Sequence, residues 1–199
     1  MSGGIKAEAN AFAYLMTGVS PRVAKTTPGA GVSIGGFVFF NIHKHFALQI
    51  DVLYHFKQAY TQQHGIYGEL RSLSTEIPFY VVGQWRFKDK GRLYVGTGPD
   101  VDFGYYAVLE SNGEKFDLYK KDDDTELSAM QNNSMGWAVM AGYEFPFGLQ
   151  LNIAYKGAFY NVLDANRTEV GAYPYTLSIG AAYRFGLTAP KRKGGGDVD

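Results

Sequence analysis

Apolar and polar residues alternate along most of the chain with a period of two. Between residues 46 and 57, for example, Phe46, Leu48 and Ile50 share one parity, and polar residues occupy much of the other. Successive side chains of a β-strand point to opposite faces, so this period predicts strands with one apolar face. The pattern recurs along the chain, less cleanly in the first two segments, and predicts eight strands: 7–17, 31–41, 46–57, 73–87, 93–105, 137–145, 149–159 and 175–185.

The connections between the predicted strands are alternately short and long. Only a few residues join the second strand to the third, the fourth to the fifth and the sixth to the seventh. A membrane-spanning up-and-down barrel has tight turns at one end and longer loops at the other. We therefore predict an all-β fold, an eight-stranded antiparallel up-and-down transmembrane β-barrel with both termini at the short-turn end. The long links cover residues 18–28, 61–68, 110–133 and 163–172.

The apolar parity can face either way, because a soluble barrel of the lipocalin type turns it inward around an apolar ligand. In this chain the polar parity is rich in small residues such as Gly96, Gly98, Ala154 and Ala182. A sheet facing water favours Thr, Lys and Glu, whereas a narrow lumen needs small residues beside its few long ones. The sequence favours an apolar parity that faces lipid, with the soluble lipocalin-like barrel as the alternative.

Aromatic residues of the apolar parity gather toward both ends of the predicted strands. Such rings are typical of the two girdles of a membrane barrel, whereas rings that fill a soluble core are not sorted in this way. At the short-turn end the predicted girdle comprises Trp85, Phe87, Tyr143, Phe145, Tyr183 and Phe185; at the long-loop end it comprises Tyr54, Phe56, Phe103, Tyr105, Phe159 and Tyr175.

Charged residues of the opposite parity face the lumen in this assignment. Buried charges must pair, so we expect salt-bridged layers that fill the barrel and prevent conduction of large solutes. Glu76 and Glu144 are the first candidates for partners of Arg86. The predicted lumen charge network comprises Asp51, Glu76, Arg86, Asp100, Asp102, Glu144, Lys156 and Arg184.

Several short segments resemble a known family of membrane barrels. The motifs are Ser33-Ile34-Gly35-Gly36, Glu76-Ile77-Pro78, Gly98-Pro99 and Gly180-Ala181-Ala182-Tyr183-Arg184-Phe185. They are similar to hairpins and the closing strand of the small outer-membrane β-barrel family common in Bacteroidota. The resemblance implies an eight-stranded barrel like the transmembrane domains of OmpA and OmpX, in the outer membrane, with a PorT-like role in secretion as one possibility. Two features depart from the family: residues 1–6 show no secretory signal, and the chain continues beyond Phe185, although such barrels usually end with an aromatic residue.

Composition narrows the function classes. The chain has 19 Lys and Arg against 19 Asp and Glu, so its net charge of zero argues against a nucleic-acid partner held by bulk electrostatics. It has no cysteine, which excludes disulfides, a thiolate nucleophile and Cys-ligated metals. No segment approaches the roughly 18 apolar residues of a spanning helix.

We expect one barrel domain over residues 1–186 and a flexible tail over 187–199.

Candidate chemistry is sparse, and we expect no cofactor. His43 and His45 have a chelating spacing but fall in a predicted turn. The acidic segment 110–133 can gather carboxylates around Ca²⁺, but it lacks the EF-hand glycine, so a solvated loop is favoured. An outer-membrane lipid-modifying enzyme is the second alternative, and it needs His55 or His64 beside a loop serine and an acid.

We therefore expect a non-enzymatic outer-membrane barrel with a structural, surface-contact or secretion-accessory role. Its expected partners are outer-membrane lipid on the wall and a protein on the loops 61–68, 110–133 and 163–172.

Overall fold

Long antiparallel strands dominate the computed structural model. The structure describes residues 1–18, 25–26, 28–63, 66–88, 90–121, 128–163 and 171–186. Within these ranges eight long strands are β1 (Ser2–Thr17), β3 (Gly29–Asn41), β4 (Phe46–Gln63), β5 (Ile66–Phe87), β6 (Gly91–Ser111), β8 (Asn133–Glu144), β9 (Leu149–Ala158) and β10 (Gly171–Phe185). Two short strands, β2 (Lys25–Thr26) and β7 (Glu114–Asp117), pair with β4 and β6. The predicted tail, 187–199, lies outside the described residues.

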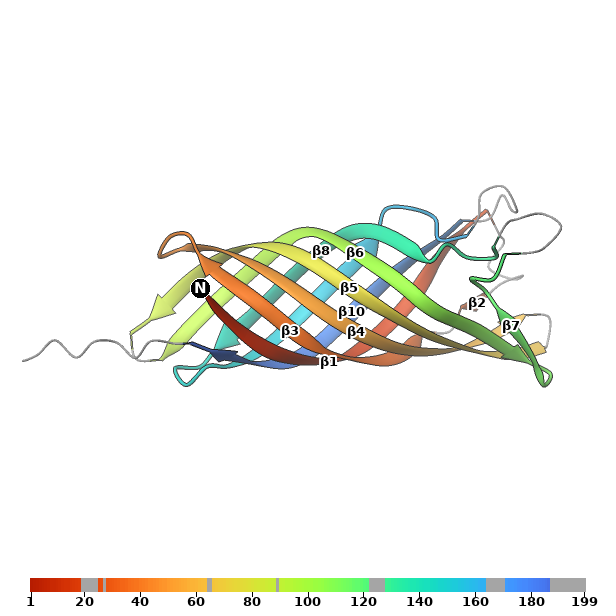
Figure 1. The fold of residues 1–199 in the computed structure, drawn as a ribbon, viewed down its shortest axis with the longest axis horizontal. Helices are drawn as coiled ribbons and strands as arrows, with labels where there is room; N and C mark the ends of the chain where they lie inside the picture. The colour runs from red at the N-terminus through yellow and green to blue at the C-terminus, as the bar shows by residue number, and fades with distance from the viewer. Residues whose placement is uncertain are drawn as a thin grey trace, which may run out of the picture.

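The eight long strands close into an up-and-down barrel (Figure 1). Each pairs with the long strands before and after it, and β1 pairs antiparallel with β10. Gly3 lies opposite Phe185, so β1 begins and β10 ends at the short-turn end. Closure removes the open sheet edges of the barrel wall. The predicted fold class and strand order are confirmed.

The described residues include no helix long and apolar enough to cross a membrane.

Most strands extend further than the apolar alternation predicts, and at the long-loop end β4, β5 and β6 extend furthest. The predicted loop 61–68 is mostly paired strand, with Thr61 opposite Gly68 and Gln63 opposite Ile66. A spanning strand needs only about 10 residues, whereas β5 has 22 and β6 has 21. The strands therefore project beyond the barrel at the long-loop end (Figure 1). The sequence prediction was wrong here because hydrogen-bonded pairing continues after the apolar signal stops.

A β-bulge in β6 lies where this projection begins. Leu73 pairs with Tyr106, but Ser74 pairs with Gly104, so Tyr105 is an extra residue on β6. A bulge changes the side-chain alternation. Tyr105 and Tyr106 are consequently both exposed, and Ala107 is buried.

Candidate functional site

The outer wall of the barrel is apolar. Ile34, Leu151 and Ile179 expose 67%, 51% and 66% of their surface, although they lie well within β3, β9 and β10. Large contiguous apolar surfaces on a folded protein mark a membrane or protein interface. The polar parity points inward, as the buried Lys6, Glu8 and Asp51 show for one side of the barrel. The lipocalin-like alternative is therefore wrong, because it needs the reverse arrangement.

The predicted girdle residues are not buried in the lumen. Ten are exposed, and Tyr143 and Phe145 are partly exposed. At the short-turn end the rings of Tyr143 and Phe145 lie 5.2 Å apart, and Phe147 stacks on Phe145 at 5.5 Å. The predicted girdle omitted Phe147, which lies in a turn, and Trp137, which lies 6.5 Å from Phe159. Trp137 has a polar partner as well, because its indole Nε1 donates to Thr97 Oγ1 at 2.7 Å.

The middle of the lumen holds a network of buried charges. Lys6 Nζ lies 2.9 Å from Asp51 Oδ2 and 2.7 Å from Glu8 Oε1. Lys156 Nζ lies 3.6 Å from the other oxygen of Glu8 and also pairs with Glu76. These side chains are at most 3% exposed, so their charges are stabilised by each other and not by bulk water.

His55 extends this central network toward β1. Its Nε2 lies 3.2 Å from Glu76 Oε2, and its Nδ1 lies 3.4 Å from the Asn10 amide nitrogen. Asn10 Nδ2 also donates to Ser33 Oγ at 3.3 Å. The imidazole is thus enclosed in the lumen, away from the lipid-facing wall.

Toward the long-loop end, the network continues with Lys57, Asp100 and Asp102. Lys57 Nζ lies 3.3 Å from Asp102 Oδ2, and Asp100 is buried with its Oδ1 unpartnered. A cavity of about 30 Å³ adjoins these three side chains together with Glu76 and Lys156. A water molecule needs roughly 10–15 Å³ of such space, so this cavity has room for a few waters and no large solute.

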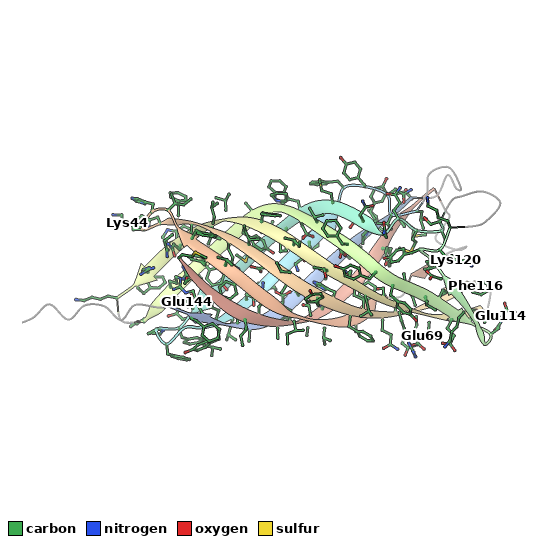
Figure 2. The ribbon with its side chains drawn as sticks, in the orientation of Figure 1. Lys44, Glu69, Glu114, Phe116, Lys120 and Glu144 are labelled. Atoms are coloured by element: carbon green, nitrogen blue, oxygen red, sulfur yellow. The ribbon has the colours of Figure 1, made fainter. Side chains whose placement is uncertain are left out.

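A second charged layer lies at the short-turn end. Arg92 Nη2 donates to Glu144 Oε2 at 2.8 Å, and Arg184 donates to the other oxygen of Glu144. Gln150 Nε2 also donates to Glu144, at 2.6 Å, and Arg92 donates to Gln84. Figure 2 shows Glu144 at this end of the barrel.

The structure corrects the prediction for Arg86. It has the inward parity, but it lies at the end of β5 and is exposed. Glu144 pairs instead with Arg92 and Arg184, and Glu76 with Lys156. Parity assigns a face of the sheet, whereas burial also depends on the position along the strand. The remaining predicted network residues face the lumen, with Asp102 only partly buried.

Sequence reasoning missed five lumen residues with acidic or basic side chains. His55, Lys57 and Arg92 have the polar parity and could have been included on that signal. The signal of the first strand is weaker, because its outward residues are mostly alanines such as Ala7 and Ala9. The other two missed residues, Lys6 and Glu8, lie on that strand. It begins at Ser2 and not at residue 7 as predicted, so Lys6 falls outside the predicted strand.

Apolar layers separate and cover the charged ones. Between the two charged layers lies a cluster that includes Phe37, Phe39, Tyr80, Tyr94 and Met140. Toward the long-loop end a second cluster includes Phe12 and Leu70, with Leu118 packed against it. These clusters and the charged layers together fill the lumen with side chains.

The segment after β7 folds back over the long-loop mouth. Leu118 N donates to Ala107 O at 2.8 Å, and Met130 N donates to Leu118 O at 2.9 Å. Tyr119 lies against Gly104, where an added Cβ would meet its hydroxyl group. Burial raises the pKa of Tyr119 to about 12. The expected solvated loop is therefore wrong for these residues, while Asp122, Asp123, Asp124 and Glu126 lie outside the described residues.

The candidate chemical groups are dispersed. His43 and His45 are exposed in the turn between β3 and β4, and their ring centroids lie 5.9 Å apart. No group of three or more His, Asp or Glu side chains suited to a metal ion occurs in the part of the chain that is described. His64 lies outside that part.

A comparison with solved structures finds similar chains. OprG from Pseudomonas aeruginosa is 13% identical, with a TM-score of 0.51 and coverage of 92% of this chain and 96% of that one. Neisserial surface protein A is 14% identical, with a TM-score of 0.48 and coverage of 92% and 97%. The outer membrane enzyme PagL is 12% identical, with a TM-score of 0.43 and coverage of 88% and 98%.

A comparison with curated proteins finds no match. The family model described as "Outer membrane protein beta-barrel domain" matches residues 3–164. These residues include most of the barrel strands, from β1 to β9. The chain therefore belongs to the outer membrane protein beta-barrel domain family.

Proposed function

We propose that this protein is a closed, non-enzymatic outer-membrane barrel that acts by surface contact through its long-loop end. The observation that carries the proposal is the part of β4, β5, β6 and β7 that continues beyond the apolar wall, which we call the projecting sheet (residues 58–63, 66–71 and 107–117). Such a sheet would place backbone and side chains outside the lipid while the filled lumen holds it in position.

The register of the strands supports an outer boundary of the lipid at the base of the projecting sheet. Phe56, Leu73 and Tyr106 form the last apolar row on the outer face. The next row places Arg71 opposite Gln58. Charged and amide side chains are costly in contact with acyl chains, so the change in composition fits a change of solvent.

Polar contacts stabilise the outer face of the projecting sheet. Gln58 Nε2 and Arg71 Nε both donate to Glu69 Oε1, at 2.5 and 2.6 Å. Tyr60 lies opposite Glu69 and is exposed. In Figure 2, Glu69, Glu114, Phe116 and Lys120 lie at this end of the molecule. An exposed mixture of aromatic and charged side chains suits contact with a protein.

The positions of the three described histidines favour a non-enzymatic role over a lipid-modifying one. His43 and His45 lie at the short-turn end, and His55 is enclosed in the lumen. None of these three is in reach of lipid at the long-loop end together with a serine and a carboxylate, as acyl transfer requires.

Surface contact is tested by placing a photo-crosslinking amino acid at Tyr60 in intact cells, with the same group at Val95 as the control. Tyr60 belongs to the projecting sheet and Val95 to the apolar wall. We expect a discrete protein adduct from position 60 and lipid adducts alone from position 95. The same products from both positions would contradict a contact role for the projecting sheet.

A closed lumen predicts no channel activity. In planar bilayers, the purified full chain is expected to give no stable single-channel steps in KCl solution, because paired charges and apolar side chains fill the lumen. The measurement is current at fixed voltage, with a known porin in the same membrane as a positive control. Reproducible conductance steps would show that the lumen opens.

A further inference from the structure

The short-turn mouth carries more positive than negative charge among its described residues. We define this mouth as the inward row Gln84, Arg86, Arg92, Glu144, Gln150 and Arg184 together with the turns that border it. Glu144 is the only carboxylate of that row, and both Arg92 and Arg184 pair with it. Gln84 and Gln150 add hydrogen bonds but no charge. One guanidinium charge therefore has no carboxylate of its own.

Arg86 adds another cation to the same mouth. It lies directly opposite Arg92 in the β5–β6 register, and like charges in opposed positions destabilise a sheet. Exposed Lys88 and Lys90 follow in the next turn, and Lys44 lies in the neighbouring turn. The turn that holds Lys44 borders β5 close to Arg86, since Gln84 N donates to His45 O at 2.8 Å.

Two buried donors of this mouth lack partners. The Nε atoms of Arg92 and Arg184 make no hydrogen bond, although both residues are only 3% exposed. A buried donor without an acceptor costs free energy. Guanidinium groups bind the oxygens of phosphate in a planar, bidentate manner. An oxyanion would supply both the acceptors and the negative charge that these guanidinium groups lack.

We propose that the short-turn mouth binds a phosphate-type anion between Arg86, Arg92 and Arg184. The anion supplies several acceptor oxygens and separates the opposed guanidinium groups of Arg86 and Arg92. It has two possible sources, the headgroup of an anionic phospholipid or free inorganic phosphate. A headgroup source fits the level of the site, because Trp85 and Phe87 flank Arg86 at the exposed end of β5 and belong to the short-turn aromatic girdle. The site is independent of the proposed surface contact at the other end.

The first experiment titrates inorganic phosphate into the full chain, folded in a neutral maltoside detergent at constant ionic strength. Calorimetry is expected to show saturable binding that Arg86→Gln weakens about tenfold, the loss expected for one charge-assisted contact. Arg86→Lys keeps the charge without the planar guanidinium group, so its affinity for phosphate should lie between those of wild type and Arg86→Gln. Arg71→Gln is the matched control, because Arg71 is an exposed arginine at the opposite end, and it should leave binding unchanged.

The second experiment distinguishes the two sources. The same proteins are placed in nanodiscs of phosphatidylcholine with or without phosphatidylglycerol, in a buffer free of inorganic phosphate, and retained lipid is measured by native mass spectrometry. If wild type retains phosphatidylglycerol and Arg86→Gln retains less of it, the site binds a lipid headgroup. If inorganic phosphate binds saturably in detergent but phosphatidylglycerol is not retained, the site binds free phosphate. Folding of each variant is checked by its circular dichroism spectrum. Absence of binding in both experiments, or equal binding by folded Arg86→Gln and wild type in both, would overturn the proposal.

Discussion

Replacing Lys156 with methionine is expected to lower the free energy of unfolding by about 3–5 kcal/mol, the usual loss when one member of a buried ion pair is removed. Lys156 is buried between Glu8 and Glu76 in the middle of the lumen. Methionine fills a similar volume but leaves the carboxylate of Glu76 without an ammonium partner. Reversible urea unfolding in lipid vesicles measures the change.

Lys115→Met is the matched control for this substitution. Lys115 pairs with Glu110 at 3.9 Å, and its side chain is 67% exposed. An exposed pair contributes about 1 kcal/mol or less. If the two lysine variants lose the same stability, the lumen network is not buried as described. A double variant, Lys156→Met with Glu76→Gln, should recover part of the loss, since it removes the uncompensated carboxylate as well.

Replacing Ile153 with arginine is expected to destabilise the barrel by about 2–4 kcal/mol in bilayers, the cost of a basic side chain near the membrane midplane. Ile153 lies in the middle of β9, opposite Ala141 on β8 and Ile179 on β10, and it points outward. Its side chain therefore meets acyl chains. The same urea titration in vesicles measures the effect.

Val108→Arg is the control, because Val108 lies on the outer face of the projecting sheet, opposite Arg71 and Asp117. A residue above the lipid should tolerate arginine at a cost of about 1 kcal/mol or less. A large loss at Val108 would place the projecting sheet in the membrane. A small loss of stability in Ile153→Arg would mean that the apolar wall does not lie in the membrane.

The barrel and its facing are predictable from sequence because lipid and lumen impose opposite chemistry on alternate residues. Residues 46–57 illustrate this, since Tyr54 and Phe56 face out while Asp51 and His55 face in. The projecting sheet is not predictable in the same way. Beyond Gln58 the outer face carries polar and charged residues such as Glu69 and Arg71, so alternation no longer distinguishes the two sides and the strand resembles a loop.

The pairing of lumen charges depends on strand register, which parity does not fix. Glu144 meets Arg92 because the two lie directly opposite each other on β8 and β6. Arg86 has the correct parity but lies at a strand end, so it escapes burial. A slip of two residues would preserve every face and change every partner.

The cover of the long-loop mouth depends on contacts between distant segments. Leu118 packs against residues of β1 and β5, and Gln131 N donates to Val162 O at 2.8 Å. The segment around Leu118 and Met130 is rich in charged and amide residues and shows no sustained apolar alternation, so local composition indicates a solvated loop. Only the closed barrel brings these residues together.

The orientation of the β9 side chains tests the central claim most directly. The chain has no cysteine, so single cysteines can be introduced at positions 150–155 and spin-labelled without a background. In lipid vesicles, electron paramagnetic resonance should show high oxygen accessibility at Leu151, Ile153 and Tyr155 and low accessibility at Gln150, Asn152 and Ala154. The reverse alternation, or strong relaxation of the Leu151, Ile153 and Tyr155 labels by a water-soluble nickel chelate, would contradict a barrel with a lipid-facing apolar wall and a filled lumen.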